Sequence, residues 1–125
     1  MPGEIIEHQA HAVGHAAILL AERGVLLAGD MLSDILIPLF DSSQDDQVGA
    51  YETALERLDE AANHVDVVVP GHGSVAEGPE VPARLAADRA YIDALRRGEG
   101  PADARLDVDW MAGIHHSNLE QARGR

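Results

Sequence analysis

The sequence contains no cysteine and no lysine, and it has few aromatic residues. Without cysteine there is no disulfide framework, no redox Cys-x-x-Cys motif and no cysteine-ligated zinc. Aromatic residues make up 3% of the chain, so the core must be built mainly from Ala, Val, Leu and Ile. The longest apolar runs, about seven residues, are far shorter than the roughly 20 that cross a bilayer. Because the first residues also lack a signal-peptide pattern, we expect a cytoplasmic protein that does not enter a membrane.

Positive charge is also scarce in this chain. Nine basic residues, all of them Arg, stand against 22 Asp and Glu, which gives 125 residues a formal charge of −13. A surface of that charge repels phosphate, and scattered aromatic residues offer no platform for stacking bases, so we expect no nucleic-acid partner. Apolar residues account for 46% of the chain, which is enough for a core and too many for a disordered acidic tail.

Apolar runs and turn residues divide the chain into strands and helices. Residues 4–7, 16–21 and 25–28 predict three strands, the last two joined by a tight turn at Glu22-Arg23-Gly24. A helical period over 47–63, a strand over 65–69 and a second helix over 82–97 follow. The continuous apolar character of the strands predicts burial on both faces of a sheet. This order is typical of an α/β fold with helices covering one sheet face.

The chain divides at the end of the second predicted helix. Pro82 is typical of a first helical position and Gly98 of a helix end, so we expect a domain over residues 1–98. We expect residues 99–125 to form an extension that packs back as a short helix and frays at its terminus.

Two strand ends carry residues that are able to bind a metal ion. Asp30 follows the strand that ends at Gly29, and His72 lies within the Pro-Gly-His-Gly turn after the next strand. Ligands gather beyond the carboxyl ends of strands in α/β sheets, and imidazole nitrogen with carboxylate oxygen suits Zn²⁺. Taken singly, Asp30 also fits a turn cap, and His72 fits a solvated loop. The other histidines each fit a surface or strand-edge position: His8, His11, His15, His64 and the His115-His116 pair.

Together these motifs resemble the C-terminal half of the metallo-β-lactamase superfamily. The resemblance rests on His11, Gly14, the Gly29-Asp30 pair and the string Val67-Val68-Val69-Pro70-Gly71-His72-Gly73, and it runs from about Ile5 to Arg97. It implies half of an αβ/βα sandwich, with a mixed sheet and helices on one face. The N-terminal His-x-His-x-Asp-His loop of that family, which supplies most of the other ligands, has no counterpart in this sequence.

The resemblance also implies a set of site residues. His11 would complete a first zinc site, Asp30 would bridge two metals and orient the nucleophile, and His72 would serve the second site. His15 would either contact a metal ligand without binding the metal itself or face the substrate. One or two Zn²⁺ ions are implied, in a site that this chain leaves incomplete.

The implied activity is that of a metal-dependent hydrolase acting on a small-molecule substrate. Metal-activated water would attack an ester, thioester, amide or phosphoester, with weak or no activity from this chain alone. The alternative is a non-catalytic half-domain. A lone half leaves an apolar sheet face open, so we expect a homodimer or another chain segment to cover it.

Overall fold

The computed structural model describes residues 3–11, 15–40, 46–98, 103–107 and 110–123, so Gly14 lies outside the described residues. The first half of the chain forms strands β1 (Glu4–His8), β2 (His15–Leu20) and β3 (Val25–Gly29). Helix α1 (Gln47–Ala62), strands β4 (Val67–Pro70) and β5 (Ala76–Glu77), and helices α2 (Glu80–Arg97) and α3 (Met111–Arg123) follow. Short 3-10 turns occupy Ala21–Arg23 and Ala104–Asp107.

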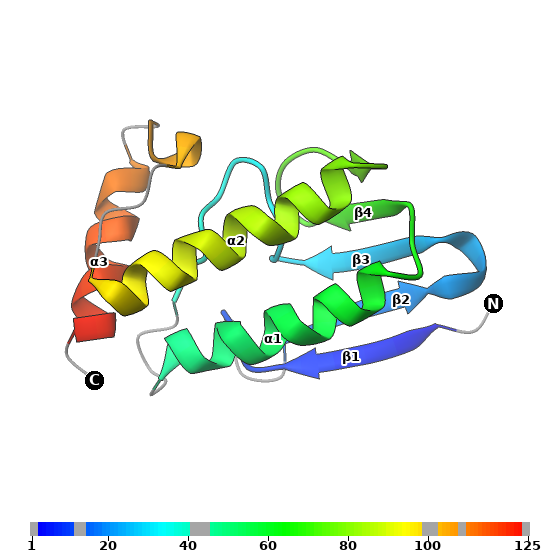
Figure 1. The fold of residues 1–125 in the computed structure, drawn as a ribbon, viewed down its shortest axis with the longest axis horizontal. Coiled ribbons are helices and arrows are strands. Elements are labelled where there is room, and N and C mark those ends of the chain that lie inside the picture. The colour runs from blue at the N-terminus through cyan, green and yellow to red at the C-terminus, as the bar shows by residue number, and fades with distance from the viewer. Residues whose placement is uncertain (1–2, 12–14, 41–45, 99–102, 108–109, 124–125) are drawn as a thin grey trace.

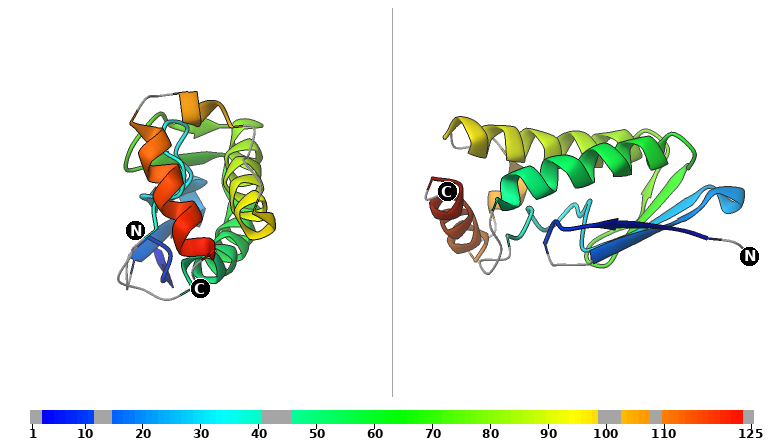
Figure 2. Two further views of the ribbon diagram at one scale, coloured as in Figure 1. Left: turned by 90° about the vertical axis from the view of Figure 1, so that its left-hand side faces the viewer. Right: turned by 90° about the horizontal axis from the view of Figure 1, so that it is seen from below.

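The strands described here form one mixed sheet in the order β1-β2-β3-β4-β5. Within it, β3 and β4 run parallel, and the other neighbouring pairs are antiparallel. Helices α1 and α2 lie side by side over one face of this sheet. Helix α3 lies across the N-terminal end of α1 and the C-terminal end of α2 (Figures 1 and 2). The predicted α/β class, with a mixed sheet and helices on one face, is therefore confirmed.

The core lies between the two long helices and the inner face of the sheet. Leu26 at the centre of β3 pairs with Leu19 of β2 and Val68 of β4, and all three are buried. Opposite them, α1 contributes buried Leu55 and Leu58, while α2 and α3 contribute buried side chains at Val81, Leu85, Ile92, Leu95 and Met111. Aliphatic side chains thus make up most of the core, together with buried Tyr51 and Tyr91, as the scarcity of aromatic residues requires.

The outer face of the sheet has no helix over it among the described elements (Figure 2). Strand register places Ile5, Ile18, Leu27 and Val69 in one row across four strands. Ile5 is 69% exposed and Ile18 is 39% exposed. The prediction that the strands are buried on both faces is therefore wrong for the described residues, because both long helices pack on the same side.

The element boundaries follow local signals closely. Helix α2 begins two residues before the predicted start, so Pro82 stands in its first turn, where its missing N–H costs no helical bond. Gly98 ends α2, as predicted, and the structure gives it a left-handed conformation with φ of 74°. The two-residue β5 is too short to leave a sequence pattern. Among the described helices, none is both long and apolar enough to span a bilayer.

Candidate metal centre

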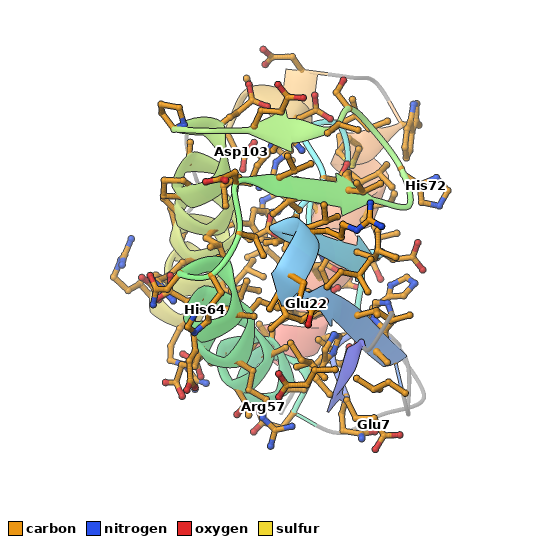
Figure 3. All side chains as sticks on the ribbon, turned by 90° about the vertical axis from the view of Figure 1, so that its right-hand side faces the viewer. Glu7, Glu22, Arg57, His64, His72 and Asp103 are labelled. Atoms are coloured by element: carbon orange, nitrogen blue, oxygen red, sulfur yellow. The ribbon has the colours of Figure 1, made fainter. Side chains whose placement is uncertain are left out.

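The candidate site lies where parallel strands β3 and β4 end. Asp30 follows the last residue of β3, and His72 lies two residues beyond β4. The backbone N–H of Gly71 donates to the carbonyl of Gly29 at 2.6 Å, so the two loops are joined directly after the strands. His11 comes from the segment between β1 and β2. Figure 3 shows His72 on the side of the sheet away from the long helices.

The structure brings two of the predicted ligands, His11 and His72, close to the third, the carboxylate of Asp30. His11 Nε2 lies 3.3 Å from Asp30 Oδ2, and His72 Nε2 lies 3.5 Å from Asp30 Oδ1. The side chains of His11, Asp30 and His72 are 25%, 38% and 60% exposed, which leaves the group open to solvent on one side. Each imidazole therefore meets a different oxygen of Asp30.

The hydrogen bond made by His11 Nδ1 determines whether Nε2 presents a proton or a lone pair to the Asp30 carboxylate. His11 Nδ1 lies 3.2 Å from the carbonyl oxygen of Leu39, and a carbonyl only accepts, so Nδ1 carries the proton. In the neutral ring, Nε2 then presents a lone pair toward Asp30. Two acceptors facing each other repel unless a proton or a cation lies between them. An outward-facing nitrogen backed by an N–H to a backbone carbonyl is the usual arrangement of a metal-binding histidine.

Donor type and spacing both fit zinc. Two ligands of a tetrahedral zinc ion, each bound at 2.0–2.1 Å, lie about 3.3 Å apart. The His11–Asp30 and His72–Asp30 separations of 3.3 and 3.5 Å match that value and are longer than a usual N–H···O hydrogen bond. Across the described residues, no group of three or more His, Asp or Glu side chains is arranged to hold one ion. The arrangement thus consists of two His–Asp pairs that share Asp30.

His15 supports the backbone of Asp30. Its Nδ1 donates to the carbonyl of Ala10 at 3.1 Å, and its Nε2 accepts from the backbone N–H of Asp30 at 3.1 Å. Both ring nitrogens are therefore occupied. Gly29 has φ of 62°, and a side chain there would clash with His15 Nε2, so the glycine before Asp30 is required for this contact.

Buried charges hold the first part of the loop that follows Asp30. Arg105 donates to the carbonyls of Ser33 and Leu36 and pairs with Asp88 at 2.6 Å. Asp88 also accepts from the N–H of Leu32, whose carbonyl accepts from Arg84. Leu32 has φ of 61°, a strained conformation for a leucine that these bonds hold in place.

A second set of bonds holds the end of that loop. Tyr51 accepts from the N–H of Leu39 at 3.0 Å and donates to its carbonyl at 2.9 Å. Asn118 of α3 donates to the carbonyl of Pro38 at 2.6 Å and accepts from the N–H of Phe40. Burial raises the pKa of Tyr51, so its hydroxyl stays protonated and able to donate. Because the Leu39 carbonyl also orients His11, helices α1 and α3 both support that imidazole.

Sequence reasoning missed these supporting residues, although part of the signal was present. Arg84 and Asp88 fall on the same stripe of α2 as buried Val81, Leu85 and Ile92. Charged residues on an apolar helix stripe need partners, which pointed to a buried ionic network. Arg105, the partner of Asp88, lies in the region beyond α2, and nothing local in the sequence connects the two.

The remaining surface histidines lie outside the candidate site. His115 Nδ1 lies 2.7 Å from the hydroxyl of Tyr91, and His116 pairs with Glu120 at 3.2 Å. His64 lies on the helix side of the molecule, opposite His72 (Figure 3).

His8 differs from the surface position expected of it. It pairs with His15 in the β1–β2 register, is 3% exposed, and lies edge-on to the His15 ring at 4.7 Å between centroids. Neither of its ring nitrogens has a hydrogen-bond partner among the described residues. Burial lowers the pKa of His8 from 6.5 to about 4, and the nearby charges of His15, Arg57 and His11 add to that effect.

We expect the imidazole of His8 to make the folded protein less stable as the pH is lowered. Between pH 6.5 and about 4 the unfolded chain binds a proton at this imidazole while the folded chain does not, so acid favours unfolding. Over that interval, protonation of His8 in the unfolded chain lowers the free energy of unfolding by at most about 3 kcal/mol. Urea unfolding of His8→Gln should show a smaller loss over the same interval, whereas the surface variant His64→Gln should follow the parent. An identical pH dependence in the His8→Gln variant and the parent would contradict this assignment.

The fold and this site together define an α/β chain of the kind found in metallo-hydrolases, with an aspartate held between two histidines at the strand ends. The chain matches the metallo-beta-lactamase superfamily over residues 2–72, which is more than half of its length. It therefore belongs to that superfamily.

The proteins similar to this chain include one of known structure and one compared by sequence. A metallo-beta-lactamase family protein from Thermus thermophilus, known from its crystal structure, superposes with a TM-score of 0.65 at 26% identity. The match covers 98% of this chain and 44% of that protein. A Halorubrum lacusprofundi protein named uridylate kinase is 35% identical over 100 residues, covering 80% of this chain and 38% of its own length. The chain thus spans less than half the length of each.

Proposed function

We propose that this chain supplies the Asp30 half of a zinc-dependent hydrolase site. The observation that carries the proposal is the bridging position of Asp30, with one oxygen near His11 and the other near His72. Zinc bound there would supply Lewis acidity and an activated water for attack on an ester, thioester, amide or phosphoester. His11 and His72 would hold the ions, Asp30 would join them, and His15 would keep the Asp30 backbone in place.

Two ligands for each ion are fewer than protein zinc sites use, which is three or four. The remaining ligands would come from protein outside these residues, consistent with a chain that spans 44% of its solved relative. We therefore expect weak binding and slow hydrolysis from this chain alone. The word kinase in the name of the Halorubrum lacusprofundi relative describes that protein. This chain has no lysine, so it supplies no lysine to clamp transferring phosphates.

Hydrolysis assays with and without chelator test the activity. The purified chain, dialysed against zinc, is incubated with a p-nitrophenyl ester, a thioester and a bis-p-nitrophenyl phosphodiester. We expect a low rate on at least one substrate that EDTA abolishes and that Asp30→Ala lacks. A rate unaffected by EDTA, or one that Asp30→Ala retains, would overturn the proposal.

A second candidate is a non-catalytic half-domain that self-associates through its sheet. The open row of Ile5, Ile18, Leu27 and Val69 favours it, because a monomer seldom exposes a continuous apolar face of this kind. In a longer protein, a further segment of the chain would cover the same row.

We expect the isolated chain to form a dimer that buries this row. Light scattering at micromolar concentration should give twice the chain mass of 13.3 kDa, and Ile18→Glu should return it to that mass. The matched variant Val75→Glu, at an exposed apolar residue outside the row, should leave the dimer intact. A parent protein that stays monomeric would exclude self-association.

A further inference from the structure

The two loops of the candidate site are linked by a carboxylate outside the proposed ligand set. Asp34 Oδ1 accepts the backbone N–H of Ser74 at 2.9 Å, two residues beyond His72. Its other oxygen, Oδ2, lies 3.5 Å from Arg84 of α2. The bond from Ser74 lowers the pKa of Asp34, with a smaller contribution from Arg84, so the side chain stays ionised.

The partner of Asp34 on α2 is itself fixed in the core. The Arg84 side chain is 6% exposed and donates to the carbonyl of Leu32, two residues beyond Asp30. It also pairs with Glu80 at 2.7 Å. Asp34 therefore connects the His72 loop to a rigid point of the helix layer that also holds the Asp30 loop.

The glycine after His72 allows this close approach. Gly73 has φ of 100°, and a side chain there would clash with Asp34 Oδ1 and crowd Ser33 Oγ. The Pro-Gly-His-Gly string thus has a second structural reason for its last glycine, beyond turning the chain. The contact also explains how a loop with a 60% exposed histidine keeps a defined position beside Asp30.

We propose that Asp34 is a positioning residue that holds the His72 loop against Asp30. The expected effect of Asp34 on zinc binding rests on the proposed function, but the loop contact itself exists in the metal-free protein. With Asp34 removed, the N–H of Ser74 loses its acceptor and His72 samples positions away from Asp30 Oδ1. His11 is unaffected, because Leu39 and Tyr51 hold it independently.

Two readouts test this role, using Asp34→Ala with Glu80→Ala as the matched control. Glu80→Ala removes a carboxylate partner of Arg84 without touching the His72 loop. In metal-free protein, we expect the Ser74 amide to exchange with solvent roughly tenfold faster in Asp34→Ala and to be unchanged in the control. With zinc, binding seen at the His72 ring by NMR should weaken about 10–100-fold, with binding at the His11 ring retained.

Asp34→Asn should behave much like the parent in both measurements, because its amide oxygen still accepts the Ser74 N–H. Unchanged Ser74 exchange in Asp34→Ala, or equal weakening of zinc binding at His11 and His72, would overturn the positioning role. If the parent chain binds no zinc at either imidazole, the proposed function fails, while Ser74 exchange still decides whether Asp34 holds the loop.

Discussion

Replacing Asp30 by Ala is expected to weaken zinc binding at both imidazoles at least about 100-fold. The carboxylate is the group that approaches both His11 and His72, at 3.3 and 3.5 Å. Losing a residue that merely supports a ligand already costs about 10–100-fold in metal affinity, so losing a ligand shared by both imidazoles should reach or exceed the upper end of that range. Competition titration with a zinc chelator of known affinity measures the loss.

Asp30→Asn should fall between the parent and Asp30→Ala, because it keeps one oxygen donor and loses the charge. Asp59→Ala serves as the control, since Asp59 is a half-exposed carboxylate on α1 that pairs loosely with Arg89, at 3.8 Å. Its zinc affinity should equal that of the parent. Retention of parental affinity by Asp30→Ala would remove Asp30 from the site.

Replacing Asp88 by Ala is expected to cost about 3–5 kcal/mol of folding stability. Asp88 is 2% exposed, and its two oxygens accept from Arg105 and from the N–H of Leu32. Burial raises the pKa of Asp88, and the Arg105 guanidinium opposes that rise. Without the carboxylate, the Arg105 charge keeps Asp103 as its ionic partner among the described residues, and Leu32 loses the bond that holds its strained backbone.

Thermal unfolding should show this loss as a fall of roughly 10–20 °C in the midpoint. Asp59→Ala is again the matched control, because exposed ion pairs contribute about 0–1 kcal/mol. Should Asp88→Ala fail to fold, urea unfolding of Asp88→Asn gives the same comparison with the side-chain volume kept. A loss within about 1 kcal/mol in both variants would show that the network does not hold the Asp30 loop.

Local signals in the sequence predicted much of this fold. The Gly-containing turn between β2 and β3 formed where expected, and Gly98 ended α2. Asp30 and His72 came together because each follows one of two neighbouring parallel strands, whose carboxyl ends share an edge. Such features depend on residues close in sequence or on one rule of sheet geometry.

The features that sequence reasoning missed depend on contacts between distant residues. Arg105 donates to the carbonyl of Ser33, 72 residues earlier, and Asn118 donates to Pro38, 80 residues earlier. His8 is buried because the last residue of β1 faces the helices, and the β1–β2 register sets that face. Neither the burial of His8 nor the exposure of Ile5 follows from composition, because both depend on which side of the sheet the helices cover.

A zinc titration followed by NMR of the histidine ring nitrogens tests the central claim most directly. Long-range proton–nitrogen correlation spectra distinguish Nδ1 from Nε2 in each ring. We predict that His11 carries its proton on Nδ1 before zinc is added, and that zinc shifts Nε2 of both His11 and His72 and leaves His64 and His116 unchanged. Zinc-induced shifts confined to other histidines, or none at His11 and His72, would contradict the proposal that Asp30 joins two zinc half-sites.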